Sequence, residues 1–91
     1  MWYVYILECQ NGAYYTGVTS HLKHRLQGHR EGTSHYTGTY PPIGLVYQER
    51  FLIKADAEQR EAQLKRWSRA KKTALIHGDK VLLRKLSRSR D

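Results

Sequence analysis

Glu61 is the acidic residue whose position most strongly indicates chemistry. In a helix predicted over 56–67 it lies four residues after Ala57 and three before Leu64, on the apolar stripe. A carboxylate there must be paired, metal-bound or in contact with solvent, because burying it bare is costly. An ordinary surface ion pair with Lys65, one helical turn later, is the alternative that position alone favours.

Arg25, His29 and two tyrosines are further candidates. Arg25 and His29 lie four residues apart, so on a helix they share one flank. A guanidinium offers paired donors to a phosphate, and an imidazole can transfer a proton near neutral pH. Alone, such a pair on a basic helix is more often a solvated face, and strand tyrosines such as Tyr5 and Tyr15 are ordinarily core residues. All four together with a carboxylate would be unusual for packing alone.

A β-hairpin is expected to bring the tyrosines together. Residues 2–7 and 13–18 are rich in β-branched and aromatic side chains and flank a turn sequence. A two-residue Asn-Gly turn would place Tyr5 and Tyr15 on opposite faces, so we predict a three-residue loop at 10–12 that ends on a glycine at positive φ. This register places Val4, Ile6, Thr16 and Val18 on one face and Tyr5, Leu7, Tyr15 and Gly17 on the other.

The middle of the chain should carry Arg25 and His29 on a helix. Thr19 or Ser20 can cap a helix that begins near residue 21, and Gly32 stops it. Consecutive prolines exclude both a helix and a central strand, so we expect a loop over 33–44. A third strand is predicted over 45–51.

Three helices are expected in the C-terminal third. Asp56 is predicted as the N-cap of the first, with Gln59 in a capping box and an end near residue 67. Ser68 restarts a helix through residue 76 that Gly78 ends, and Asp79 caps a final amphipathic piece. The fold class is therefore α/β of the α+β kind: a three-stranded antiparallel sheet flanked by helices, in the order β-β-α-β-α-α with a further short C-terminal helix.

Size and composition favour one small domain with a shallow site. We expect a single domain over 1–86 and a frayed basic tail over 87–91 of the 91 residues. With 40% hydrophobic residues the chain is too apolar for a disordered basic tail. Its single cysteine argues against a disulfide-stapled secreted scaffold, and no segment fits a signal peptide or membrane span. We therefore expect a cytoplasmic protein.

Positive charge is concentrated at one end of the sequence. The formal net charge is +8; residues 1–61 hold six basic and six acidic side chains, whereas residues 62–91 hold ten and two. A one-sided basic segment is typical of a nucleic-acid partner, because neutralised phosphates release counterions. A solvated tail explains the charge equally well.

The ordered motifs resemble the GIY-YIG nuclease domain. The resemblance rests on Tyr3-Val4-Tyr5, Tyr15-Thr16-Gly17, Arg25-Leu26 with His29, and Arg60-Glu61 with Lys65. It is closer still to a small stand-alone bacterial group whose chains begin with a YVYIL-type strand and carry YYTG in the second strand. It covers residues 2–77, with Tyr3 in place of the family's first glycine.

The resemblance implies hydrolysis of phosphodiester bonds in DNA with one divalent metal, Mg²⁺ or Mn²⁺. By this resemblance Glu61 binds the metal, and Tyr15 is the general base or orients the attacking water. Tyr5 supports that water and the scissile phosphate, Arg25 stabilises charge on the phosphoryl oxygens, and His29 matches a histidine of many members. Since a tyrosine's ordinary pKa is about 10, a base role requires nearby cations to lower it.

Substrate contacts are expected at three further residues. Many family members carry a phosphate-positioning asparagine after the glutamate, whereas the only asparagine here is Asn11. That role is vacant or passes to Lys65 or Ser68. His35 and Thr37 match a basic-x-Thr stretch of the stand-alone group and are expected to touch the DNA backbone.

The leading hypothesis is a metal-dependent DNA endonuclease or nickase with little sequence specificity, acting in DNA repair or processing, whose basic helices contact backbone phosphate. The absent asparagine supports an alternative: a DNA-binding or repair-accessory module with weak or no catalysis. A third hypothesis is a structural subunit whose leucine-bearing C-terminal segment pairs with a partner or with itself. We expect DNA as the partner, no membrane contact, and a monomer.

Overall fold

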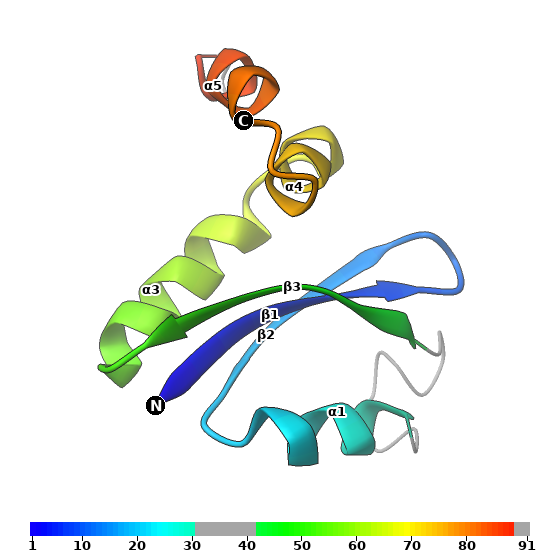
Figure 1. The fold of residues 1–91 in the computed structure, drawn as a ribbon, viewed down its shortest axis with the longest axis vertical. Helices are drawn as coiled ribbons and strands as arrows, with labels where there is room; N and C mark the ends of the chain where they lie inside the picture. The colour runs from blue at the N-terminus through cyan, green and yellow to red at the C-terminus, as the bar shows by residue number, and fades with distance from the viewer. Residues whose placement is uncertain (31–41, 89–91) are drawn as a thin grey trace.

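A three-stranded antiparallel sheet forms the centre of the computed structural model, which describes residues 1–30 and 42–88 (Figure 1). The strands are β1 (Trp2–Cys9), β2 (Tyr14–Thr19) and β3 (Pro42–Phe51), in the spatial order β2-β1-β3. The helices are α1 (Leu22–Arg30), α3 (Lys54–Lys65), α4 (Arg69–Ile76) and α5 (Lys80–Ser87). The expected α+β class and element order are confirmed. The expectations for Gly32, His35 and Thr37 and for the end of the tail lie outside the described residues.

The predicted hairpin register is confirmed. Leu7 pairs with Tyr15 and Tyr5 pairs with Gly17. The loop closes through a hydrogen bond from the Cys9 amide to the Ala13 carbonyl at 2.9 Å, and the last loop residue, a glycine, has φ 82°. A positive φ is inexpensive only for glycine, so this loop fixes which side chains share each face of the sheet.

The third strand begins earlier than expected, which corrects the predicted loop over 33–44 at its C-terminal end. β3 starts at Pro42, whose Cα is paired with that of Cys9 in β1. β3 lies at the edge of the sheet, where a proline is tolerated because one side of the strand makes no ladder hydrogen bonds. The pairing with β1 shifts register twice near this end.

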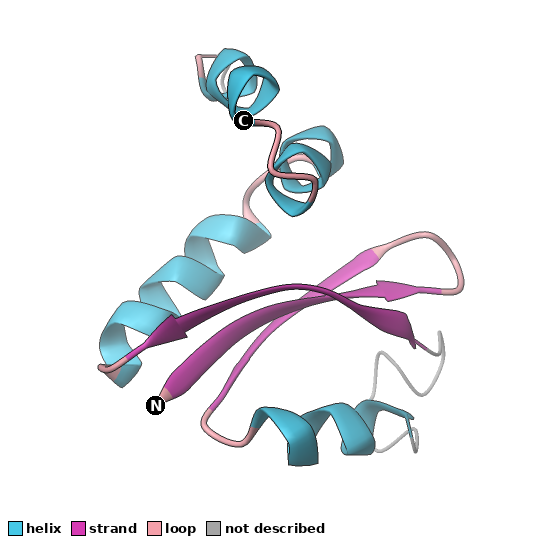
Figure 2. Cartoon of the chain, viewed as in Figure 1, coloured by secondary structure: helices cyan, strands magenta, loops and turns pink. Residues whose placement is uncertain are grey.

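The two sheet faces carry different helices (Figure 2). On one face the side chains of Val4 and Ile6 are fully buried against Ala57 and Leu64 of α3, which forms the hydrophobic core. The other face carries Tyr5, whose hydroxyl contacts α1. The sheet therefore separates a packed apolar layer from the face that holds the tyrosines.

Helix boundaries are partly as expected. Ser68 accepts a hydrogen bond from the Lys71 amide, and Asp79 accepts one from the Leu82 amide at 3.0 Å, so the predicted helix start at Ser68 and the predicted cap at Asp79 are confirmed. Asp56 as an N-cap is wrong, and the capping box with Gln59 fails with it. The N-cap lies three residues earlier, at Ile53, so Asp56 lies in the first turn of α3, where its negative charge interacts favourably with the helix dipole.

The C-terminal helices are joined by a short glycine turn. Gly78 has φ 68° and directly follows the C-cap of α4. Within the described part of the chain, none of the helices combines the length and apolar character needed to cross a membrane.

Candidate functional site

Tyr5 lies at the centre of a polar cluster on the α1 face of the sheet. Its side chain is only 1% exposed, although it carries a hydroxyl that needs partners. The ring lies over Gly17 on the neighbouring strand: a Cβ at position 17 would stand 2.5 Å from the Tyr5 hydroxyl oxygen and 2.6 Å from Cζ. Glycine at this position is therefore what makes room for the tyrosine.

Helix α1 supplies two polar partners for this hydroxyl. His29 Nε2 lies 2.7 Å from the Tyr5 hydroxyl oxygen, and Arg25 Nε donates to the same oxygen at 3.4 Å. Burial lowers the pKa of His29, and the nearby positive charge of Arg25 lowers it further. Arg25 Nε donates to the Tyr5 oxygen, and a neutral imidazole protonated on Nδ1 can accept the Tyr5 O–H at Nε2.

Tyr15 completes the aromatic part of the cluster. Its ring centroid lies 4.8 Å from that of His29 and 6.3 Å from that of Tyr5. The pKa of Arg25 is raised, first by its hydrogen bond with Tyr5 and, against the effect of burial, by one with Tyr15. Tyr15 is half-buried, whereas Tyr5 is fully buried. Tyr15 is therefore the phenol with better access to a bound substrate.

Glu61 reaches this cluster electrostatically from α3. Its carboxylate is 21% exposed and lies 3.4 Å from Lys65 Nζ, so the simple ion pair expected from the sequence is present. Its charge also contributes to raising the pKa of Tyr5. This contribution is smaller than those of burial, Arg25 and Tyr15, so the carboxylate acts on the tyrosine cluster more weakly than its neighbours there do.

The pKa of Tyr5 does not follow the expectation for a tyrosine base. Burial raises it above its ordinary value, and the negative charges of Tyr15 and Glu61 act in the same direction. The hydrogen bond and charge of Arg25 lower it without outweighing burial. Tyr5 is thus a neutral hydroxyl at physiological pH, suited to holding Arg25 and His29 in place.

The donor set around Glu61 fits a cation that brings most of its own ligands. Among residues 1–30 and 42–88, no group of three or more His, Cys, Asp or Glu side chains is arranged to hold a metal ion. One partly exposed carboxylate suits Mg²⁺ or a similar hard cation, which keeps several water ligands and is also coordinated by the substrate phosphate.

Of the other residues predicted to contact the substrate, Lys65 and Ser68 lie within the described part of the chain, whereas His35 and Thr37 do not. Lys65 is 56% exposed beside Glu61, and the pKa of Lys72 is lowered by burial and by the charge of Lys65. These two amines therefore form a small positive area next to the carboxylate. The Ser68 hydroxyl caps α4, and the Asn11 side chain accepts from the Ala13 amide in the hairpin loop, so both already have structural roles.

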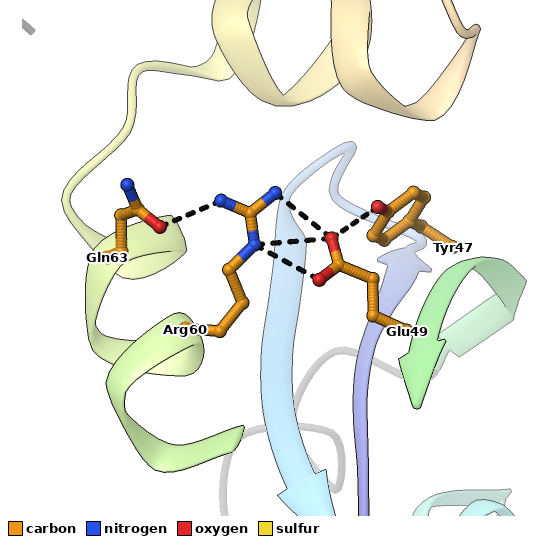
Figure 3. Close-up of polar contacts among 4 residues, drawn as sticks. All are labelled: Tyr47, Glu49, Arg60 and Gln63. Atoms are coloured by element: carbon orange, nitrogen blue, oxygen red, sulfur yellow. Dashed lines mark hydrogen bonds and ion pairs between the residues drawn. The ribbon is translucent and has the colours of Figure 1, made fainter. Parts of the chain in front are cut away.

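A second polar cluster, on the opposite face, escaped the sequence analysis (Figure 3). Arg60 of α3 contacts Glu49 of β3 through Nη2 at 3.0 Å and Nε at 3.2 Å, and it donates to Gln63 at 2.7 Å. Tyr47 donates to Glu49, and burial together with that bond raises the pKa of Tyr47 to about 12. The pair ties α3 to β3 directly beside Glu61. Its signal in the sequence is a carboxylate between inward-facing Tyr47 and Phe51.

Helix α4 is fixed to the tip of the hairpin. The guanidinium of Arg69 lies 4.3 Å from the Tyr14 ring centroid and donates to the Gly12 carbonyl. The Tyr14 and Thr73 hydroxyls are hydrogen-bonded at 3.0 Å. These contacts hold the start of the basic C-terminal region against the sheet.

Residues 1–74 match the family model described as the GIY-YIG catalytic domain. The chain therefore belongs to the GIY-YIG family, and membership implies nuclease activity in general, with DNA as the substrate and divalent metals in general use.

More particularly, its relatives are UPF0213 proteins, which form a small stand-alone GIY-YIG family. One from Xanthomonas axonopodis pv. citri (strain 306) is 40% identical over 76 residues, covering 82% of this chain and 74% of the relative. Another, from Staphylococcus haemolyticus (strain JCSC1435), is 41% identical over 75 residues, covering 81% and 92%. The solution NMR structure of a UPF0213 protein from Bacillus halodurans has a TM-score of 0.56 at 39% identity, covering 85% of this chain and 84% of that one.

Proposed function

We propose that this protein is a divalent-metal-dependent DNA endonuclease or nickase that hydrolyses phosphodiester bonds with little sequence specificity. The observation that carries the proposal is the convergence of Tyr5, Tyr15, Arg25 and His29 in one hydrogen-bonded aromatic cluster on which the Glu61 charge acts. Packing alone does not require two phenols, a guanidinium and an imidazole to meet in this way.

Each side chain of the cluster has a role in the proposed reaction. A phosphodiester repels an incoming hydroxide, so positive charge must lie against its oxygens while water is activated. Arg25 supplies that charge, and its hydrogen bonds to both tyrosines fix its orientation. Tyr15, the more accessible phenol, orients or deprotonates the attacking water. Tyr5 and His29 hold Arg25 in place through the hydrogen bonds at the Tyr5 hydroxyl.

Glu61 would hold the divalent cation, which supplies Lewis-acid stabilisation of the phosphoryl oxygens. In the free protein, Lys65 pairs with this carboxylate. In the proposed complex its amine moves to a backbone phosphate.

Contacts to the DNA backbone explain the proposed low sequence specificity. Phosphate contacts position the nucleic acid without reading its bases. Lys65 and Lys72 beside Glu61, together with the basic residues of α4 and α5, form the proposed backbone contact. The roles of His35 and Thr37, a function in DNA repair, a cytoplasmic location and the monomeric state stay predictions.

Nicking of supercoiled plasmid tests the proposal. The wild type should nick in Mg²⁺ or Mn²⁺ and not in EDTA, and Glu61→Gln should lower the rate at least ~100-fold because the charged ligand is lost. Glu58→Gln is the matched control, since this exposed glutamate lies on the same helix and its loss changes the net charge equally.

Two outcomes would overturn the proposal in different ways. Equal nicking by the wild type and Glu61→Gln would remove Glu61 from the reaction. Binding that persists in EDTA, with no product under any divalent ion, would instead indicate a DNA-binding module.

A further inference from the structure

A concave surface lies between α1 and the β3 side of the sheet. It is a cleft of about 1090 Å³. Its walls come from one side of α1 and from β1 and β3, and include Tyr3, Lys23, Leu26, Arg30, Leu45 and Arg50. Arg25 and His29 do not line it, because they lie on the flank of α1 that faces the tyrosine cluster.

Helix periodicity and strand register together build this cleft. Lys23, Leu26 and Arg30 follow the i, i+3, i+7 spacing that places side chains on one helix face. On the sheet, Tyr3 of β1 is paired with Arg50 of β3, so the aromatic ring and the guanidinium are cross-strand neighbours on the α1 face. Both walls therefore present a mixture of apolar and cationic groups.

The charged side chains of the described residues that line the cleft are all basic. Lys23, Arg30 and Arg50 are exposed, and the imidazoles of His21 and His24 also line the cleft. Among the described residues that line the cleft, none is Asp or Glu. The partly buried Leu26 and Tyr3 provide apolar surface between the cations. Such a surface is complementary to a ligand that carries repeated negative charge and flat apolar faces.

We propose that this cleft binds a single-stranded segment of nucleic acid, with phosphates on Lys23, Arg30 and Arg50 and a base against Tyr3. This binding is separate from the proposed hydrolysis, since neither Glu61 nor the tyrosine cluster takes part in it. It gives the protein a second contact on the opposite flank of α1.

Single-stranded nucleic acid fits better than a duplex for a physical reason. A duplex presents phosphates but keeps its bases stacked inside, so the apolar part of the cleft would find no partner. A single strand offers both groups, and proteins that bind it combine a positive groove with an aromatic stacking surface.

Fluorescence anisotropy with a labelled single-stranded oligonucleotide, in EDTA to prevent cleavage, tests this binding independently of catalysis. The affinity is measured across a salt series for the wild type and for Lys23→Ala/Arg50→Ala. The matched control is Lys54→Ala/Arg66→Ala at the two ends of α3, which removes the same charge from exposed positions outside the cleft and outside the proposed backbone contact. Tyr3→Leu tests the stacking contact while keeping the position apolar.

The cleft variant should reduce the slope of log K against log salt by about 1.4, because each lost phosphate contact on a single strand contributes about 0.7. The α3 control should change it by much less. Tyr3→Leu should weaken binding at least ~5-fold without changing the slope. Equal effects of the cleft and α3 variants would overturn the proposal, as would a duplex of the same length that binds through Lys23 and Arg50 at least as tightly as the single strand.

Discussion

Gly17→Ala tests the close approach on which the tyrosine cluster depends. The added Cβ would lie 2.5 Å from the Tyr5 hydroxyl oxygen and 2.6 Å from Cζ, well inside van der Waals contact. Tyr5 is fully buried between β2 and α1, so its ring cannot simply turn into solvent. The ring must shift, and the 2.7 Å hydrogen bond to His29 should lengthen or break.

The expected cost follows from three terms. Overpacking a buried site costs about 1–3 kcal/mol, and losing a hydrogen bond costs about 1 kcal/mol more. Replacing a strand glycine by alanine also stabilises the folded state by about 0.5–1 kcal/mol through a smaller loss of backbone entropy, which offsets part of this cost. The net loss in the free energy of unfolding should be about 2 kcal/mol, which for a domain of this size lowers the Tm by about 10 °C.

Gly44→Ala is the matched control for this substitution. Gly44 also lies in a strand, and a Cβ added there meets no atom within 4 Å. It should leave stability unchanged or raise it by about 0.5 kcal/mol. Urea unfolding followed by circular dichroism measures both variants. A Gly17→Ala variant as stable as Gly44→Ala would refute the proposed packing of Tyr5.

Three further measurements address individual groups. Absorbance titration at alkaline pH should show one tyrosine ionising near pH 12, and Tyr47→Phe should remove that step. Because this folded pKa lies above the ordinary value of about 10, stability from Tyr47 should be present below pH 10 and lost as pH rises toward 12; an unchanged titration would contradict the bond to Glu49. The lowered pKa of His29 means that the unfolded chain takes up its proton first, so stability should fall as pH drops below about 6.5. His29→Gln should flatten that part of the pH profile, and parallel profiles would argue against a neutral buried imidazole. Finally, Lys65→Met should raise the affinity for Mn²⁺ up to ~5-fold, because the ion pair with Glu61 no longer competes; calorimetry showing no gain would place the cation elsewhere.

Local chemistry made several elements predictable. The hairpin register followed from a glycine at positive φ and from the need to sort apolar side chains to one face. The caps at Ser68 and Asp79 depend only on residues within three positions of each cap. The errors occurred where neighbouring elements decide: Asp56 is not the cap because only two residues separate the end of β3 from the start of α3, and β3 accepts Pro42 because it lies at an edge.

By itself, the sequence determined which residue types are available and which neighbours share a helix flank or a strand face, because those relations depend on periods of 3.6 and 2. Only the tertiary structure decided that Arg25 and His29 both meet the Tyr5 hydroxyl and that Glu61, from a helix on the other face, acts on it. It also decided that Arg60 forms an ion pair with Glu49. These partners are separated by many residues, and their contacts exist only after the core between sheet and α3 has packed.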